Sequence, residues 1–240
     1  MQVVPPLRSK VRGALWLAFY RSLVRRYFEN VWIRETDPMP SGGYVVAVSH
    51  QSEWDSRVLA LWQYEHRPKR FCTYANEGTL RSAPMMRWLG AFSKKGEGAE
   101  ALRDLLRFAR ERCEAGEPVC FLAEGLAGHS NAIGPLKRGF ANVAVAAGVP
   151  VVPLVFRYVM RRSLRPEVFI AAGAPLAPSS NVRDEAFAAM TRLYAEIERD
   201  VIEDTVEANY RVMLRGKTPL VQTAFNIAGP ILALLSRRRR

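Results

Sequence analysis

The sequence predicts a single α/β domain with a mostly parallel or mixed sheet that is flanked by helices. Short apolar runs alternate along the chain with stretches in which apolar residues recur every three or four positions, as strands and amphipathic helices require. The length of 240 residues, of which 49% are hydrophobic, suits one such domain with terminal extensions and is short for two.

Strands and helices alternate through the expected domain, residues 40–215. The apolar runs lie at residues 44–48, 70–74, 85–93, 119–123, 151–156 and 167–171. Helical patterns occupy a segment that ends near Trp62 and residues 99–114, 140–147 and 184–212. The last segment predicts one long charged helix with an apolar stripe.

Residues 1–35 predict an amphipathic helix that lies on a membrane surface. Apolar and aromatic side chains recur at helical spacing at Trp16, Phe19, Tyr20, Leu23, Val24, Tyr27, Phe28 and Val31. Basic residues fill much of the remainder, and such a helix suits an anionic lipid interface. A helix packed on its own domain explains the same periodicity, so both alternatives stay open. The segment lacks the uninterrupted apolar region and the cleavage site of a signal peptide.

Residues 216–240 predict an apolar segment with an arginine-rich end. A membrane-spanning helix needs about 20 apolar residues. Residues 220–235 are fewer and are interrupted by Gln222, Asn226 and the pair Gly229 and Pro230. An interfacial or re-entrant segment anchored by the four terminal arginines fits better, with a helix docked on the core as the alternative.

The charge balance predicts an anionic partner. A formal charge of +12 and a pI near 10.1 attract nucleic acid, anionic lipid or phosphorylated small molecules alike. The basic residues cluster in the terminal segments beside apolar and aromatic ones, and no nucleic-acid-binding module is recognisable, so we expect an anionic membrane surface and no nucleic acid. Three histidines and three cysteines show neither metal-ligand spacing nor a disulfide framework, so we expect no metal and a reducing compartment.

His50 and Asp55 form the first candidate for catalysis. Two residues five apart lie about 140° apart around a helix, so they would not face each other within one. A strand-to-helix turn after residues 44–48 would instead allow Asp55 to reach one imidazole nitrogen. A carboxylate in that position orients a histidine that acts as a general base.

Four further stretches accompany this pair in a fixed order. They are Leu89 to Lys95, Phe121 to Gly125, Leu136 to Phe140 and Val151 to Val155. With His50 and Asp55, they resemble the glycerolipid (lysophospholipid) acyltransferase family, including its 1-acylglycerol-3-phosphate acyltransferases, over about residues 40–175. The resemblance implies transfer of a fatty acyl group from an acyl thioester, either acyl-CoA or acyl-ACP, to the hydroxyl of a lysolipid. It implies no cofactor besides that co-substrate.

The resemblance assigns roles residue by residue. His50 would be the general base and Asp55 its orienting carboxylate. Glu124, Gly125, Lys94, Lys95, Lys137 and Arg138 would bind substrate, and Pro153 would have an architectural role. Glu124 could also be a structural acid.

The chain departs from the family pattern around Glu124. Ala123 stands where the family usually has proline, and residues 126–128 replace a hydroxyl residue and an arginine that helps to hold the acceptor's phosphate. Lys94, Lys95, Lys137 and Arg138 are candidate replacements for that cation. An acceptor without a phosphomonoester therefore stays open.

Other classes of protein fit less well. Residues 96–101 form a poor dinucleotide-binding pattern, because a glutamate between the glycines would crowd a pyrophosphate. No G-x-S-x-G motif supports a serine hydrolase. The alternative function is a non-catalytic, basic membrane-surface binding protein on an inactive acyltransferase scaffold. Both functions place the protein at the cytoplasmic face of a membrane, as a peripheral or monotopic protein.

Overall fold

The computed structural model describes residues 2–66, 70–125 and 132–217, and it confirms the predicted α/β domain with a mixed sheet. The strands lie in the order β1-β5-β4-β6-β3-β7-β8-β2-β9. Their bounds are β1 Val3–Val4, β2 Asn30–Glu35, β3 Val45–Val48, β4 Cys72–Tyr74, β5 Ala91–Lys94, β6 Val119–Leu122, β7 Val151–Val159, β8 Glu167–Ala172 and β9 Arg211–Arg215. The helices are α1 Lys10–Tyr27, α2 Asp55–Glu65, α3 Glu77–Ser82, the 3₁₀ helix η1 Pro84–Leu89, α4 Gly98–Glu114, α5 Gly139–Ala147, α6 Val182–Ile202 and α7 Val206–Asn209.

Parallel strands form the centre of the sheet. β3 pairs in parallel with both β6 and β7, and β4 pairs in parallel with β5 and β6. Antiparallel pairs join β7 to β8 and add the outermost strands β1 and β9. All four residues of β3 are buried, because helices cover both faces of the sheet at this point. The near-continuous apolar run at residues 44–48 reflects that double burial.

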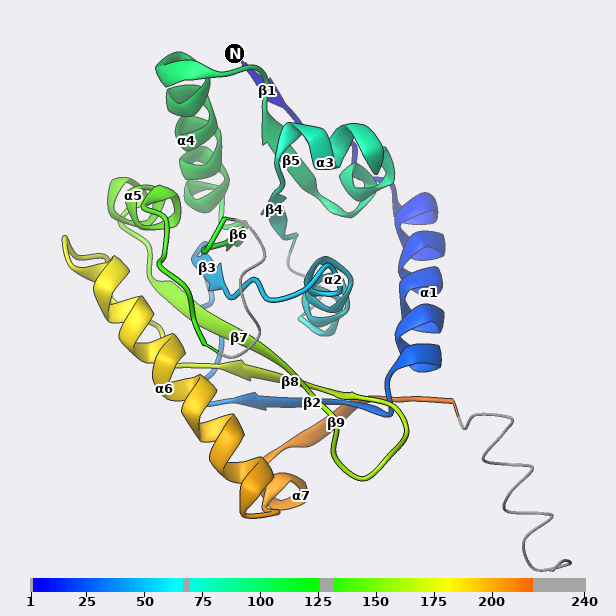
Figure 1. The fold of residues 1–240 in the computed structure, drawn as a ribbon. Coiled ribbons are helices and arrows are strands. Elements are labelled where there is room, and N and C mark those ends of the chain that lie inside the picture. Colours follow the sequence, from blue (N-terminus) through cyan, green and yellow to red (C-terminus); the bar gives the residue numbers. More distant parts are fainter. Residues whose placement is uncertain (1, 67–69, 126–131, 218–240) are drawn as a thin grey trace, which may run out of the picture.

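The two faces of the sheet carry separate hydrophobic clusters. Val45 and Ala47 point into a cluster with α4, α5 and α6, whereas Val46 and Val48 point into a cluster with α1 and α2. Figure 1 shows these two groups of helices on opposite sides of the sheet. The alternation of side chains along each strand therefore divides the core into two layers.

The N-terminal segment contains strand as well as helix. Only Lys10–Tyr27 of residues 1–35 is α-helical, and Asn30–Glu35 forms β2, which pairs with β8 inside the sheet. The buried side of α1 packs against α2 and η1 through Gly13, Leu17, Tyr20 and Val24. The other side exposes the large apolar residues Val11, Leu15 and Phe19. The helix thus packs on its own domain and also keeps an apolar face in solvent, and its contact with a membrane stays a prediction.

The prediction of one helix over residues 184–212 is wrong at its C-terminal end. α6 ends at Ile202, Asp204 takes a left-handed φ of 58°, and Arg211–Arg215 becomes the edge strand β9 beside β2. An aspartate tolerates this conformation better than most residues, so the polar stretch 203–205 ends the helix. The predicted apolar C-terminal segment lies outside the described residues from 218 onward. Over the described part of the chain, no helix has both the length and the apolar character to cross a membrane.

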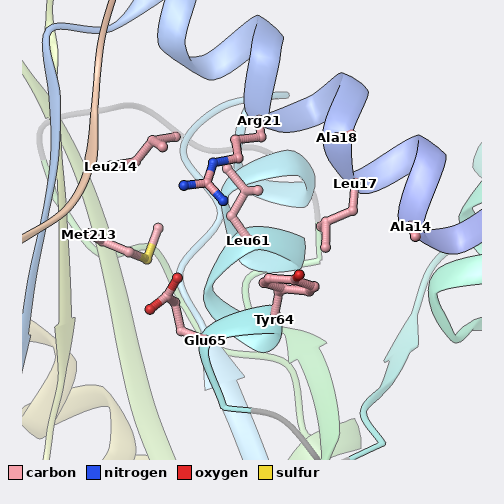
Figure 2. Close-up of a pocket in the computed structure, with 9 residues that line it drawn as sticks. All are labelled: Ala14, Leu17, Ala18, Arg21, Leu61, Tyr64, Glu65, Met213 and Leu214. Carbon is pink, nitrogen blue, oxygen red and sulfur yellow. The ribbon is translucent and has the colours of Figure 1, made fainter.

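A small cavity of about 130 Å³ separates α1, α2 and β9. Figure 2 shows its lining, which includes the polar side chains Arg21, Tyr64 and Glu65 beside Leu17 and Met213. None of the residues predicted to bind or transform substrate lines this space. The predicted site therefore lies elsewhere.

Candidate active site

His50 and Asp55 meet as the turn geometry predicts. His50 lies two residues beyond the carboxyl end of β3, and Asp55 is the first residue of α2. The imidazole Nδ1 lies 3.0 Å from Asp55 Oδ2. A carboxylate accepts hydrogen bonds, so this contact places the proton of a neutral imidazole on Nδ1 and leaves Nε2 as a proton acceptor.

The Asp55 carboxylate is held from several directions. Its side chain is fully buried, and Oδ2 also accepts hydrogen bonds from the backbone N–H groups of Gln51, at 2.7 Å, and Ser52, at 2.9 Å. The loop between β3 and α2 therefore wraps around the carboxylate. These bonds satisfy the buried carboxylate, and they fix the position from which it orients His50.

Tyr158 holds the other oxygen of Asp55. Strand β7 extends beyond the carboxyl end of β3, and there the hydroxyl of Tyr158 donates to Asp55 Oδ1 at 2.5 Å. Burial, together with the charge and the hydrogen bond of Asp55, raises the pKa of Tyr158 well above its usual value. The phenol therefore stays protonated and serves as a hydrogen-bond donor.

Glu124 stands beside His50 because β3 and β6 are parallel and in register. Val48 pairs with Leu122, and these are the last residues of β3 and β6. His50 and Glu124 each lie two residues beyond that pair. Glu124 Oε1 accepts the backbone N–H of His50 at 2.7 Å, and Oε2 accepts that of Gly134 at 2.7 Å. The side chain is buried. These contacts fit the structural-acid alternative, while its contact with substrate stays a prediction.

A cavity of about 720 Å³ opens beside this cluster. Its walls combine apolar side chains from α2, η1 and β5 with polar ones from α2, β4 and α3, and its volume is in the range of sites that hold organic ligands. The residues that line it include His50, Arg57, Gln63, Met86, Gly125 and Lys137. The cavity therefore joins the predicted base to a space large enough for substrate.

The predicted cations are divided between this cavity and the outer surface. Lys137 borders the cavity, and its side chain passes Gly125, where an added Cβ would lie 3.3 Å from the Lys137 Cγ and Cε atoms. Lys94 instead pairs with Glu97 at 2.6 Å, and Lys95 and Arg138 are exposed. None of these last three residues lines the cavity in the described part of the chain. Their substrate-binding roles stay predictions.

Two residues of this arrangement were missed by the sequence reasoning. Tyr158 falls just beyond the predicted strand 151–156, although it continues the alternation of Leu154 and Phe156 on one face of β7. That period of two is a signal that could have found it. Gly134 contributes only a backbone N–H, and nothing in its side chain indicates the contact.

Within the described residues, the cysteines and the potential metal ligands do not form a second centre. Cys72, Cys113 and Cys120 are buried and unpaired, and burial is the largest cause that raises the pKa of each thiol to about 12. Among the described residues, no group of three His, Cys, Asp or Glu side chains could hold a metal ion.

The fold and the site together define an α/β protein with a histidine–carboxylate pair at the carboxyl end of a central parallel strand, beside a cavity of about 720 Å³. Residues 30–157, more than half of the chain, match the family described as Acyltransferase. The chain belongs to the acyltransferase family.

Named relatives agree with this assignment. The chain is 32% identical over 120 residues to the human 1-acyl-sn-glycerol-3-phosphate acyltransferase alpha, a match that covers 48% of this chain and 41% of the relative. The bovine protein of the same name is also 32% identical over 120 residues, covering 48% of this chain and 40% of the relative. The chain thus spans about two fifths of the length of these curated relatives.

A solved structure shares the fold. The 1-acyl-sn-glycerophosphate (LPA) acyltransferase PlsC of Thermotoga maritima matches with a TM-score of 0.55 and 19% identity, over 78% of this chain and 77% of that one. All three named proteins are acyltransferases. These matches do not favour the alternative function, a non-catalytic membrane-surface binding protein.

Proposed function

We propose that the protein transfers a fatty acyl group from an acyl thioester to the hydroxyl of a lysophospholipid. One observation carries the proposal: the contact of His50 Nδ1 with the buried Asp55 leaves Nε2 for substrate, in a histidine that lines a cavity of about 720 Å³. Family membership gives the reaction class its support.

The mechanism is a direct transfer. His50 Nε2 takes the proton of the acceptor hydroxyl while the hydroxyl oxygen attacks the thioester carbonyl carbon. The tetrahedral intermediate then collapses, the carbon–sulfur bond breaks and the thiolate leaves with the electron pair. Asp55 stabilises the imidazolium, and general-base assistance of this kind contributes about 10²- to 10⁴-fold. Glu124 acts by fixing the backbone of His50.

The substrates follow from the relatives and from the charges of the cavity. The named relatives are acyltransferases of 1-acyl-sn-glycerol-3-phosphate, so a lysolipid with an anionic head group is the acceptor class that we propose. Lys137 at the cavity edge suits such an anion. The donor is acyl-CoA or an acyl-ACP, and the basic surface accommodates either one.

Both substrate and product are lipids, so the enzyme works at a membrane surface. α1 presents Val11, Leu15 and Phe19 to solvent, and Arg12 and Arg26 are exposed on the same helix. Apolar burial combined with cationic contacts to anionic lipid favours binding of such a helix to the interface. We place the enzyme at the cytoplasmic face of the membrane, as a peripheral or monotopic protein, and assign residues 216–240 to the same contact.

The test uses purified full-length protein in mixed micelles with a labelled acyl thioester and a panel of lysolipids. His50→Ala is compared with wild type and with His66→Ala. His66 is a matched control, because its Nε2 contacts Glu35 at 2.7 Å and it does not line the cavity. We expect transfer by wild type and by His66→Ala, and a loss of at least about 10²-fold in His50→Ala.

Two results would contradict the proposal. Equal transfer by a folded His50→Ala would remove the general base from the mechanism. No transfer by wild type from either acyl-CoA or acyl-ACP, with binding to anionic vesicles retained, would support the non-catalytic membrane-binding function instead.

A further inference from the structure

Arg57 brings a positive charge into the cavity that the mechanism above does not use. It lies in the first turn of α2, two residues after Asp55, and its partly buried side chain lines the same cavity as His50. Among the described residues, Lys137 is the one other lysine or arginine that lines this cavity. Arg57 is therefore a candidate to recognise an anionic substrate group.

The contacts of Arg57 hold its guanidinium without neutralising it. Nη1 donates to the backbone oxygen of Glu53 at 2.6 Å, and Cζ lies 5.3 Å from the centre of the Trp54 ring and 6.0 Å from that of Tyr20. A carbonyl dipole and two aromatic faces orient a cation, but neither supplies a full negative charge. The stacked guanidinium is thus positioned before any ligand binds.

Several arginines elsewhere in the fold are paired with a carboxylate. Arg34, Arg157 and Arg165 each lie within 4.0 Å of a carboxylate. Over the described parts of the chain, no carboxylate lies that close to Arg57. A guanidinium has five N–H donors in a planar fork that matches a phosphate. The donors of Arg57 that Glu53 does not use are suited to such a group.

The position of Arg57 favours the acceptor over the donor as its ligand. Tyr20, which stacks on Arg57, belongs to α1, the helix that we assign to the membrane. A lysolipid reaches the cavity from that surface, and its hydroxyl must meet His50, which lines the cavity with Arg57. We propose that Arg57 binds the phosphate of the lysolipid acceptor and makes the enzyme selective for acceptors that carry one. This inference rests on the proposed function.

The test compares Arg57→Gln and Arg57→Lys with wild type and with Arg81→Gln. Arg81 is a suitable control because it is exposed on α3, pairs with Glu77 and does not line the cavity. Initial rates are measured with lysophosphatidic acid and with uncharged monoacylglycerol, at fixed acyl-CoA and then at fixed acceptor. We expect Arg57→Gln to raise KM for lysophosphatidic acid by about 10- to 100-fold, as the loss of a charge-assisted hydrogen bond predicts.

The other arms separate this role from a structural or donor-binding one. Rates with monoacylglycerol should be equal in wild type and Arg57→Gln, and Arg57→Lys should recover part of the affinity, because lysine keeps the charge without the fork. An unchanged KM for lysophosphatidic acid would overturn the proposal. So would a rise in KM for acyl-CoA that is absent with acyl-pantetheine, because the arginine would then bind the donor's nucleotide phosphates.

A binding arm keeps the inference testable if wild type transfers nothing. The affinities of wild type and Arg57→Gln for labelled lysophosphatidic acid and monoacylglycerol are measured below their micellar concentrations. Weaker binding of lysophosphatidic acid alone by Arg57→Gln would support the phosphate contact even if the proposed reaction failed. Equal binding by the two proteins would refute it.

Discussion

Replacement of Tyr158 by phenylalanine tests how the proposed catalytic pair, His50 and Asp55, is held. The substitution removes one hydroxyl and leaves the ring in place. Asp55 Oδ1 then loses the contact at 2.5 Å from Tyr158, whereas Oδ2 keeps those from His50, Gln51 and Ser52. The perturbation is therefore limited to one oxygen of a fully buried carboxylate.

The expected magnitudes follow from that geometry. A hydrogen bond to a charged group contributes about 1.5–3 kcal/mol to the free energy of unfolding. For a chain of this size, each 1 kcal/mol corresponds to about 2–4 °C, so Tm should fall by roughly 3–12 °C. Because three contacts still position Asp55, kcat should fall by only about 3- to 30-fold, less than for removal of the carboxylate in Asp55→Ala.

The assay pairs thermal unfolding with steady-state acyl transfer. Tyr210→Phe is the matched control, because it removes a hydroxyl from a buried tyrosine in the cluster on the opposite face of the sheet. Its kcat should equal that of wild type. An unchanged Tm and kcat in Tyr158→Phe would show that the hydroxyl does not support Asp55. A loss of kcat as large as that of Asp55→Ala, with unchanged Tm, would show that Tyr158 acts on the substrate itself.

Three further predictions address the surroundings of the site and the rest of the fold. Gly134→Ala would place a Cβ 2.6 Å from Glu124 Oε2, so we expect lower Tm and at least about tenfold lower kcat, whereas Gly42→Ala, with no atom within 4 Å, should change neither. Burial opposes ionisation of Glu35, but hydrogen bonds from His66 and Trp62 outweigh it and lower its pKa. The stability that Glu35 contributes is therefore present above about pH 4.5 and lost as the pH falls through the folded pKa, and urea unfolding of Glu35→Gln should show a weaker loss over that range. The three buried cysteines should resist a thiol reagent at pH 7 until the protein unfolds, and rapid labelling of native protein would show that they open locally.

Much of the fold was predictable because its elements have strong periodicity. Most apolar runs and helical patterns between residues 44 and 171 correspond to strands and helices with small shifts at their ends, but the run at 85–93 divides into the 3₁₀ helix η1 and the strand β5. β2 was missed because Tyr27, Phe28 and Val31 continue the helical spacing past the end of α1. β9 was missed because the short helix α7, which follows the left-handed residue Asp204, continues the helical pattern almost up to the strand. Both segments are strands because they pair with strands that are distant in the sequence. The local spacing of apolar residues does not indicate that pairing.

The candidate site also contains some contacts that local sequence predicts and others that depend on strand pairing. The contact of His50 with Asp55 could be predicted because five residues span one turn between a strand and a helix. The contacts of Tyr158 and Gly134 depend on which strands are neighbours and on their register. A single sequence does not contain that register explicitly. Local geometry therefore identifies the pair of His50 and Asp55, and the sheet supplies the groups that hold it.

The register also gives a physical account of one departure from the family pattern. Ala123 stands where the family usually has proline, and its backbone N–H donates to Val48 O at 2.8 Å. Its carbonyl accepts the N–H of Lys137 at 2.7 Å. A proline would keep the second contact and lose the first, because it has no N–H. In this chain the parallel ladder between β3 and β6 therefore extends one residue further, up to the contact of Glu124 with the backbone of His50. The same residue that departs from the pattern thus joins the two strands that carry His50 and Glu124.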